Sequence, residues 1–430
     1  MKRTVCIAVG FSALLCAQGS GPKLSLQDAH AMALKNHPRV LASQANYLRA
    51  NEIITETRSA YYPGINGDVT GSQASDNARI GAGFLSDSRL FSRFGTGVTL
   101  SQLITDSGRT PNLVASSKLQ AQASRQDYQA TRYDVIAAVD QAYAETLLAK
   151  QLVTVAQQTV ATRQTVVTQV GELTKNKLRS QVDLSFAQVN LSQANLMLLR
   201  AQTRLESAYA NLGQALGTQQ SIRYQLTDEP LPPNPPKDAE ELIRQALQNR
   251  PEVASLRLQS EADQRFVRAE ADLKRPTVSL TGVAGFLPFI DPENANPNIA
   301  KEYEGAAINV QIPIFNGHLF SARRRAAEFQ LQAADQRLRD FEDRIARDVR
   351  NAWEGARTAY EAIGETAQLV QQANLALDLA QGRYNLGLAS IVELTQAQLG
   401  QTQAQVENLN AKYAYQEAYA ALQYTIGGLR

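Results

Sequence analysis

The sequence predicts a mainly α-helical protein with a membrane β-barrel part, built from a duplicated unit of helices, paired strands and long helices. Three observations predict this class. Two stretches, 112–176 and 318–384, contain no proline, and at 1.5 Å per residue each helix would extend roughly 100 Å. Four shorter segments carry strand-like patterns of alternating residues. The two halves of the chain also match each other at a shift of about 210 residues, which indicates a duplicated structural unit.

Residues 1–19 have the layout of a secretory signal peptide. Lys2 and Arg3 precede a mostly apolar stretch from residue 5 to residue 17, and small residues follow. Both cysteines, Cys6 and Cys16, lie in this segment, so the predicted mature chain has no thiol. Lipid attachment at Cys16 is an alternative, but the two leucines before it are bulkier than the small residue that such sites usually have.

The rest of the chain excludes some classes of protein by composition. The formal net charge of +2 gives no bias toward nucleic acid, so we expect no nucleic-acid partner. No run after the signal approaches the roughly 20 apolar residues of a membrane helix. If the mature chain crosses a membrane, the crossing segments are therefore expected to be the strands of a closed barrel.

Matching residues define the predicted domain organisation. Leu34 to Pro38 corresponds to Leu247 to Pro251, and Tyr209 to Leu212 corresponds to Tyr419 to Leu422. Between the halves lies a stretch so rich in proline that it favours an extended linker. We predict a first repeat at 20–227, a linker at 228–237 and a second repeat at 238–430.

Each repeat is expected to begin with a short helix and a medium helix. Ser25 and Asp238 are good N-caps for the two short helices, which should end before Pro38 and Pro251. The medium helices should reach residues 58 and 273, followed by two strands in each half. The predicted strands span residues 63–73, 95–105, 276–288 and 305–315.

The strand prediction depends on alternation and length. It is clearest in the fourth segment, where Ile308, Val310, Ile312 and Ile314 share one face. At about 11 residues each, the segments match tilted membrane strands, and aromatic residues lie near their ends as in membrane barrels. Four strands cannot close a barrel, so the chain is expected to oligomerise. The sequence pattern alone does not determine whether two, three or more copies form the barrel.

The second long helix of the first half carries a heptad pattern from 183 to 216, in which leucines alternate with alanines. This pattern predicts left-handed supercoiling with close helix approach. In the second half, Gln401, Asn408 and Tyr415 replace the leucines. These replacements are either ordinary variation in a coiled-coil seam or a sign that the helix faces a different neighbour or a wetter space.

The order of elements, with Tyr384, Gly387, Ser390, Glu393 and Leu394 at matching spacing, resembles the TolC-like outer-membrane efflux protein family. The resemblance covers essentially the whole mature chain. It implies a homotrimer whose 12-stranded β-barrel lies in the outer membrane of a Gram-negative-type envelope and continues into a periplasmic α-helical barrel. It also implies that the loops at 74–91 and 289–303 lie outside the cell.

The same resemblance implies an exit duct of a tripartite efflux or type I secretion system, without a catalytic step of its own. Its implied partners are a periplasmic adaptor protein, an inner-membrane pump and outer-membrane lipid. The basic run 323–325 could meet lipid phosphates, although a solvated helix face explains it as well. An alternative function is a secreted coiled-coil structural or adhesive protein, which explains the heptads but not the strands.

We expect no enzyme activity, cofactor or metal site. The three histidines, His30, His37 and His318, are far apart in the sequence, and none has a metal-ligand partner four residues on.

The resemblance places the functional residues in the turns between the long helices. The turns would form the periplasmic tip, at which the adaptor docks. The docking candidates are Lys177, Leu178, Arg179, Ser180, Gly387, Leu388, Ala389 and Ser390.

One acid follows each turn, Asp183 and Glu393. In a trimer they would form two rings of carboxylates that line the pore constriction and select cations. The alternative is that each acid only complements the dipole of its helix. Ala389 and Gln396 depart from the best-known family pattern, so a latch at the tip would need Arg179, Lys177 or Arg383.

Overall fold

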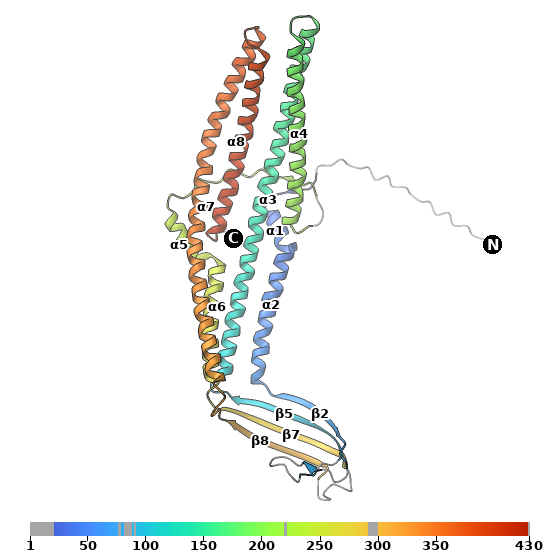
Figure 1. Ribbon diagram of the computed structural model, residues 1–430, viewed down its shortest axis with the longest axis vertical. Helices are drawn as coiled ribbons and strands as arrows, with labels where there is room; N and C mark the ends of the chain where they lie inside the picture. The colour runs from blue at the N-terminus through green and yellow to red at the C-terminus, as the bar shows by residue number, and fades with distance from the viewer. Residues whose placement is uncertain are drawn as a thin grey trace, which may run out of the picture.

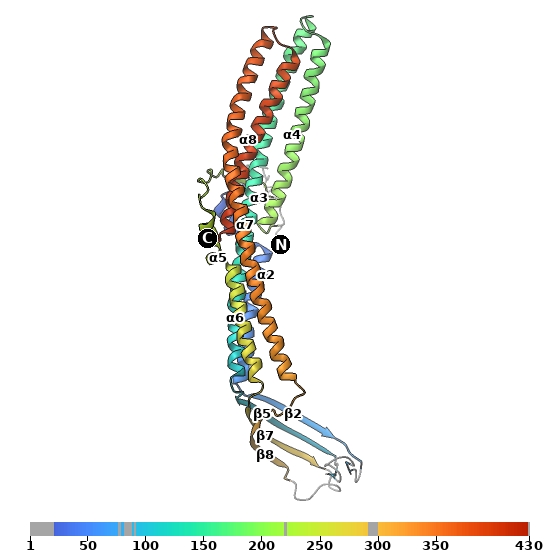
Figure 2. The ribbon, with the colours of Figure 1, turned by 60° about the vertical axis from the view of Figure 1, so that its left-hand side comes forward.

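The computed structural model shows an elongated molecule, with helical hairpins at one end and a sheet at the other (Figures 1 and 2). The predicted signal peptide and both cysteines lie outside the described residues, as do most of the loop at 74–91 and residues 291–299. The structure describes residues 21–75, 79–80, 88–89, 92–218, 222–290 and 300–428.

The predicted duplicated order of elements is confirmed. The first half contains α1 (Leu26–Asn36), α2 (Pro38–Arg58), β2 (Gly64–Ser72), β5 (Arg93–Thr105), α3 (Arg109–Lys175) and α4 (Gln181–Ala215). The second half contains α5 (Ala239–Asn249), α6 (Pro251–Asp272), β7 (Thr277–Ile290), β8 (Glu302–Gln311), α7 (Leu319–Asn385) and α8 (Ile391–Thr425). Shorter elements are β1 (Lys23–Leu24), η1 (Ser59–Tyr61), β3 (Arg79–Ile80), β4 (Ser88–Arg89) and β6 (Gln225–Leu226).

Local chemistry sets the ends of the short helices. The Ser25 hydroxyl accepts a hydrogen bond from the Asp28 amide at 3.2 Å, and the Asp238 carboxylate accepts one from the Glu240 amide at 2.9 Å. These contacts satisfy amides that have no partner within the helix. Pro38 and Pro251 then occupy the first position of α2 and α6, where a missing amide hydrogen costs nothing.

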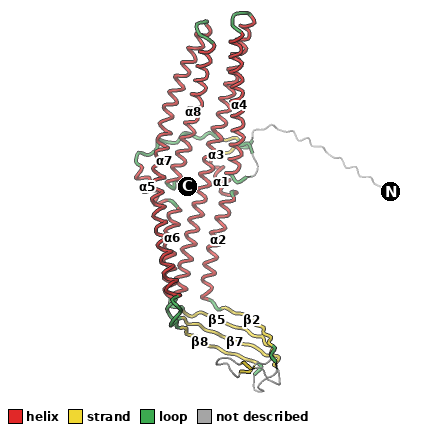
Figure 3. Tube along the Cα trace, viewed as in Figure 1, coloured by secondary structure: helices red, strands yellow, loops and turns green. Residues whose placement is uncertain are grey.

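The long helices form the frame of the molecule (Figure 3). Helix α3 contacts α2 and α4, and α7 likewise contacts α6 and α8. Helix α3 also contacts α6 and α8, so it joins the two halves. None of the helices in the described part of the chain has a stretch long and apolar enough to cross a membrane.

The seam of α4 confirms the predicted close packing. The alanines at positions 187, 194, 201, 208 and 215 are all buried, whereas Leu184, Leu191, Leu198 and Leu205 are only half-buried. In α8 the polar seam residues have polar partners on α7, because Gln401 donates to Asn374 Oδ1 at 3.0 Å and Asn408 donates to Thr366 Oγ1 at 3.1 Å. The α8 seam is therefore more polar than that of α4.

The sheet is antiparallel, with the order β2-β5-β7-β8. Because opposite residues share a face, the register gives each face its own chemistry. Ile65, Leu100, Gly282 and Ala306 form an apolar row, while the next row of Asn66, Thr99, Val283 and Gly305 is mostly polar or small. At these rows, one face of the sheet is apolar and the other is mostly polar or small.

The predicted fourth strand is wrong at both ends. It was expected at 305–315, but β8 spans Glu302–Gln311. Pro313 explains the early end, because proline has no amide hydrogen for the ladder and restricts the residue before it. Ile312, Ile314 and Phe315 follow the strand as exposed residues.

A buried tyrosine on α3, Tyr143, makes hydrogen bonds to both the start and the end of the first half of the chain. The Tyr143 hydroxyl lies 2.9 Å from the Leu24 carbonyl oxygen and 2.8 Å from that of Thr227, and it accepts from the Thr227 amide at 3.0 Å. Around it lies an apolar cluster that includes Val139, Leu147 and Leu212. The parallel pair of β1 and β6 is held against α3 in this way.

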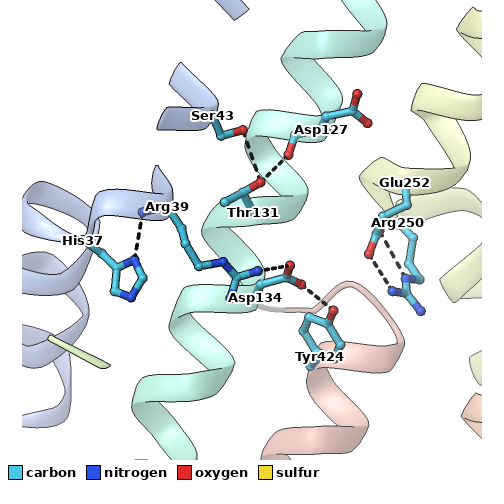
Figure 4. A network of polar contacts seen from close by, with 9 residues as sticks. All are labelled: His37, Arg39, Ser43, Asp127, Thr131, Asp134, Arg250, Glu252 and Tyr424. Atoms are coloured by element: carbon cyan, nitrogen blue, oxygen red, sulfur yellow. Dashed lines mark hydrogen bonds and ion pairs between the residues drawn. The ribbon is translucent and has the colours of Figure 1, made fainter. Parts of the chain in front are cut away.

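A polar network joins the halves near the middle of the molecule (Figure 4). The Asp134 carboxylate on α3 accepts from Tyr424 of α8 at 2.6 Å and from Arg39 of α2 at 3.3 Å. Nearby, the buried Arg250 pairs with Glu252 at 2.6 Å. The proline-rich linker packs against the same region, because Tyr413 donates to Asp228 at 3.2 Å and Gln416 donates to the Glu229 carbonyl at 3.1 Å.

We expect Tyr143→Phe to lower the free energy of unfolding by about 1–3 kcal/mol, because it leaves buried backbone groups without their partner. Thermal denaturation of the full-length protein in detergent measures this loss. Tyr133→Phe is the matched control on the same helix, where no hydroxyl contact is found among the described residues. Equal effects of the two substitutions would show that the Tyr143 contacts contribute nothing.

Candidate functional site

The two turns between the long helices lie together at the end of the molecule farthest from the sheet (Figure 1). Residues 176–180 join α3 to α4, and residues 386–390 join α7 to α8. The turns are equal in length and separated by the repeat shift of 210 residues. All eight docking candidates and both acids therefore lie at, or just beyond, these two turns, at one end of the elongated molecule.

Both turns use the same backbone hydrogen bonds. The Leu178 amide donates to the Leu173 carbonyl at 2.9 Å, and the Leu388 amide donates to that of Arg383 at 2.8 Å. This pattern ends a helix by satisfying its last carbonyls. It requires a left-handed residue, which is Lys177 (φ 59°) in one turn and Gly387 (φ 74°) in the other. The lysine adopts this conformation at a cost that glycine avoids.

The side chains of the turns divide into exposed and buried groups. Leu178, Leu386 and Leu388 are 69%, 76% and 67% exposed, so the tip presents apolar side chains to its surroundings. Lys177 and both N-cap serines are also exposed. Ala389 differs, because its side chain is buried. Among the eight candidates, Ala389 can contact a partner only through its backbone.

The serines at the starts of α4 and α8 are N-caps. The Ser180 hydroxyl accepts from the Asp183 amide at 3.1 Å, and the Asp183 carboxylate accepts from the Ser180 amide at 3.1 Å. This reciprocal capping box satisfies two helix-end amides. The Ser390 hydroxyl accepts from the Glu393 amide at 3.3 Å.

The two acids have different partners. The Asp183 carboxylate is half-buried and is occupied by the capping box. The Glu393 carboxylate is exposed and pairs with Arg383 at 3.3 Å, within the same helical hairpin. An exposed pair of this kind contributes little stability. In the single chain the Asp183 carboxylate thus caps its helix, whereas the Glu393 carboxylate pairs with Arg383.

Arg179 joins the two hairpins at the tip. Its guanidinium lies 4.5 Å from the centre of the Tyr384 ring and donates to the Tyr384 carbonyl at 3.2 Å. Tyr384 is buried, and burial raises the pKa of its phenol while the Arg179 charge opposes that shift. Of the three basic residues expected for a latch, Arg179 makes the contact between hairpins and Arg383 makes one within a hairpin.

An apolar cluster lies beneath this contact and draws on all four long helices. Its buried members are Val166, Val170, Ala187, Tyr384, Ala389, Ile391 and Leu394. In addition, Asn190 of α4 donates to Thr395 of α8 at 3.2 Å. The tip is thus a packed structure in which the two hairpins touch.

The histidines lie away from the tip, with His30 on α1, His37 at the C-cap of α1 and His318 at the N-cap of α7. His30 Nε2 lies 2.5 Å from Asp140 Oδ1, and His37 Nδ1 accepts from the Arg39 amide at 3.2 Å. Burial and the charge of Arg39 lower the pKa of His37. Over the described ranges, no group of three or more His, Cys, Asp or Glu residues could hold a metal ion.

Comparisons with known proteins agree with this geometry. The family model described as "Outer membrane efflux protein" matches residues 30–218 and 242–428. The chain is 25% identical to outer membrane efflux protein BepC of Brucella suis over 422 residues, 96% of this chain and 87% of that protein. It is 23% identical to outer membrane protein TolC of Escherichia coli over 421 residues, 94% of this chain and 81% of that protein.

A solved structure supports the fold directly. A membrane protein from Pseudomonas aeruginosa superposes with a TM-score of 0.80 and 21% identity, covering 94% of this chain and 93% of that chain. A sheet continuous with long paired helices is the fold that this chain shares with that structure. Together with the family match, this fold defines an outer-membrane channel that extends into the periplasm. The chain belongs to the outer membrane efflux protein family, and it is an outer-membrane efflux channel.

The contact between Arg179 and Tyr384 was not predicted as a pair. The two residues are 205 positions apart in the sequence. Arg179 belongs to the first repeat and Tyr384 to the second. The sequence places Arg179 in the first turn, whereas Tyr384 enters only as a member of the spacing pattern. Their pairing depends on how the hairpins pack together, which no local pattern specifies.

We expect Ser180→Ala to destabilise the first turn of α4 by about 0.5–2 kcal/mol, because the Asp183 amide loses its acceptor. Hydrogen exchange of the amides at 181–185 should become faster, and Asp183→Ala should act in the same direction. Ser185→Ala is the control, because the Ser185 hydroxyl only donates to the Gln181 carbonyl within the helix. Unchanged exchange in Ser180→Ala would contradict the capping role.

Proposed function

We propose that the chain works as a homotrimer that forms a passive exit duct for substrates delivered by an inner-membrane pump through a periplasmic adaptor protein. The observation that carries this proposal is the pair of matching turns with exposed leucines at the far end of the helical hairpins. Such exposed apolar side chains at the end of a long structure favour contact with another protein.

The edges of the sheet support assembly into a closed barrel. Strands β2 and β8 are the two edges of the four-stranded sheet, and each has a neighbour on one side only. Unpaired backbone groups in lipid cost several kcal/mol each. Pairing β2 of one copy with β8 of the next removes this cost, and three copies supply the twelve strands of the proposed barrel.

Exposed apolar residues on the helices support the same assembly. On α4, Val182, Phe186, Val189 and Leu196 are exposed at intervals of four, three and seven residues, which fit a heptad pattern, and Leu199 is exposed as well. On the other side, α7 exposes Leu369, Leu375 and Leu379. We infer that α4 of one copy packs against α7 of the next. This packing closes the helices into a hollow cylinder.

The acids near the turns are the proposed pore constriction. In a trimer, Asp183 and Glu393 each form a ring of three carboxylates, and such rings favour cations. The proposal requires that the carboxylates keep their negative charge at the constriction while they also serve their local contacts. Arg383, which pairs with Glu393, then moderates the charge of one ring.

Single-channel recordings test the acid rings. We expect Asp183→Asn and Glu393→Gln together to lower the preference for potassium over chloride by about half or more, because two negative rings are removed. Asp378→Asn on α7 is the control, since it removes an acid outside the turns. An unchanged preference in the double variant would exclude both residues from the constriction.

Site-specific cross-linking tests the docking surface. We expect Leu178→Asp and Leu388→Asp to reduce cross-linking to the adaptor about tenfold or more, because a charge cannot desolvate in an apolar interface without a partner. Leu231→Asp in the linker is the control for an exposed leucine away from the tip. Trimers must persist in each variant, as size-exclusion chromatography measures. Undiminished cross-linking of the tip variants would place the docking surface elsewhere.

A further inference from the structure

A polar pocket lies between α3 and α8, where the two hairpins run side by side. Its volume is about 200 Å³, and four residues of each helix line it. All eight are glutamine, threonine or arginine, and none is acidic. The residues used below are Gln158, Thr162, Arg163, Gln398, Gln401 and Gln405. Gln401 is one of the polar residues that replace leucines in the α8 seam.

Arg163 is the one charged residue among those that line the pocket. Its side chain is only 6% exposed, and its Nη1 atom is buried without a hydrogen-bond partner. Across the described ranges, no ion pair involves this guanidinium. Burial lowers its pKa, and no neighbouring charge acts on it. A buried charge without a partner is strongly unfavourable, so the native protein needs a compensating group.

The pocket itself offers hydrogen-bond donors but no negative charge. Gln158, Gln398 and Gln405 bring amide groups, which donate as well as accept. The Thr162 hydroxyl already donates to the Gln158 carbonyl at 3.0 Å, and Gln401 donates to Asn374 at 3.0 Å. A guanidinium has only donors and carries a positive charge, and the pocket supplies neutral acceptors but no negative charge. An anion would satisfy both the donors and the charge of Arg163.

We propose that this pocket binds a small inorganic anion, such as chloride or phosphate, through Arg163. The volume of about 200 Å³ is far above the roughly 10–15 Å³ that a cavity needs to hold one water, so a partly hydrated ion fits. Glutamine amides complete the coordination. This site is separate from the turns and does not depend on the adaptor proposal.

The position of the site gives the bound anion a structural effect. Helix α3 belongs to the first half and α8 to the second, and Arg163 lies 12 residues before the end of α3, or roughly 18 Å along the helix from the turn. An anion held between them links the hairpins below the tip. It therefore stabilises the arrangement in which Arg179 contacts Tyr384.

Thermal denaturation of the full-length trimer in detergent tests the proposal. Sodium chloride or phosphate replaces sodium gluconate at constant ionic strength. We expect the Tm of the wild type to rise saturably by about 2 °C or more, and the Tm of Arg163→Gln to stay constant. Arg125→Gln is the matched control, an exposed arginine on the same helix, and should respond as the wild type does.

A Tm of the wild type that is independent of the anion would overturn the proposal, as would an equal response in Arg163→Gln. Crystals of the wild type grown with bromide give a second measurement that does not require a stable variant. An anomalous peak beside Arg163 Nη1 supports the site. An empty pocket, or a carboxylate from another copy of the chain beside the guanidinium, contradicts it.

Discussion

The packing along α3 is the interaction on which the rest of the structure depends. This helix buries residues along its whole length, and it contacts α2, α4, α6 and α8 in turn. Helix α7 has the same length but buries far fewer residues in the protomer. The two halves therefore have the same plan and different roles. One long helix packs along its whole length within the chain, and the other leaves most of its surface exposed in the single chain.

The sheet and the tip are both consequences of this frame. Because α3 follows β5 directly and ends at the first turn, one continuous element connects the membrane part to the far end of the molecule. The second repeat adds a parallel connection through α7. The two turns at the tip are thus the far ends of the same helices, α3 and α7, that begin beside the sheet. The Arg179 contact and the Arg163 pocket both lie where the two connections approach each other.

Much of the fold could be predicted from the sequence, because its signals are local. Pro38 and Pro251 mark helix boundaries, and Ser25 and Asp238 cap the helices that they were expected to cap. The strand predicted at 305–315 ran past Pro313, although proline disfavours a continued ladder and β8 ends at Gln311. The tip residues were located because turns lie between long periodic stretches. The environment of Arg163 and the partner of Arg179 depend on contacts between helices more than 200 residues apart, which periodicity does not specify.

The alanine seam of α4 has a mechanical consequence. Helix α4 has 35 residues and so extends roughly 50 Å from its base to the turn. A tilt of about 6° at the base, near Ala208 and Ala215, would displace the turn by roughly 5 Å. A methyl group added to one of these alanines would push α4 away from its neighbour at the base, and the displacement would be largest at the turn. The packing at the base of α4 therefore sets the position of the turn at its far end.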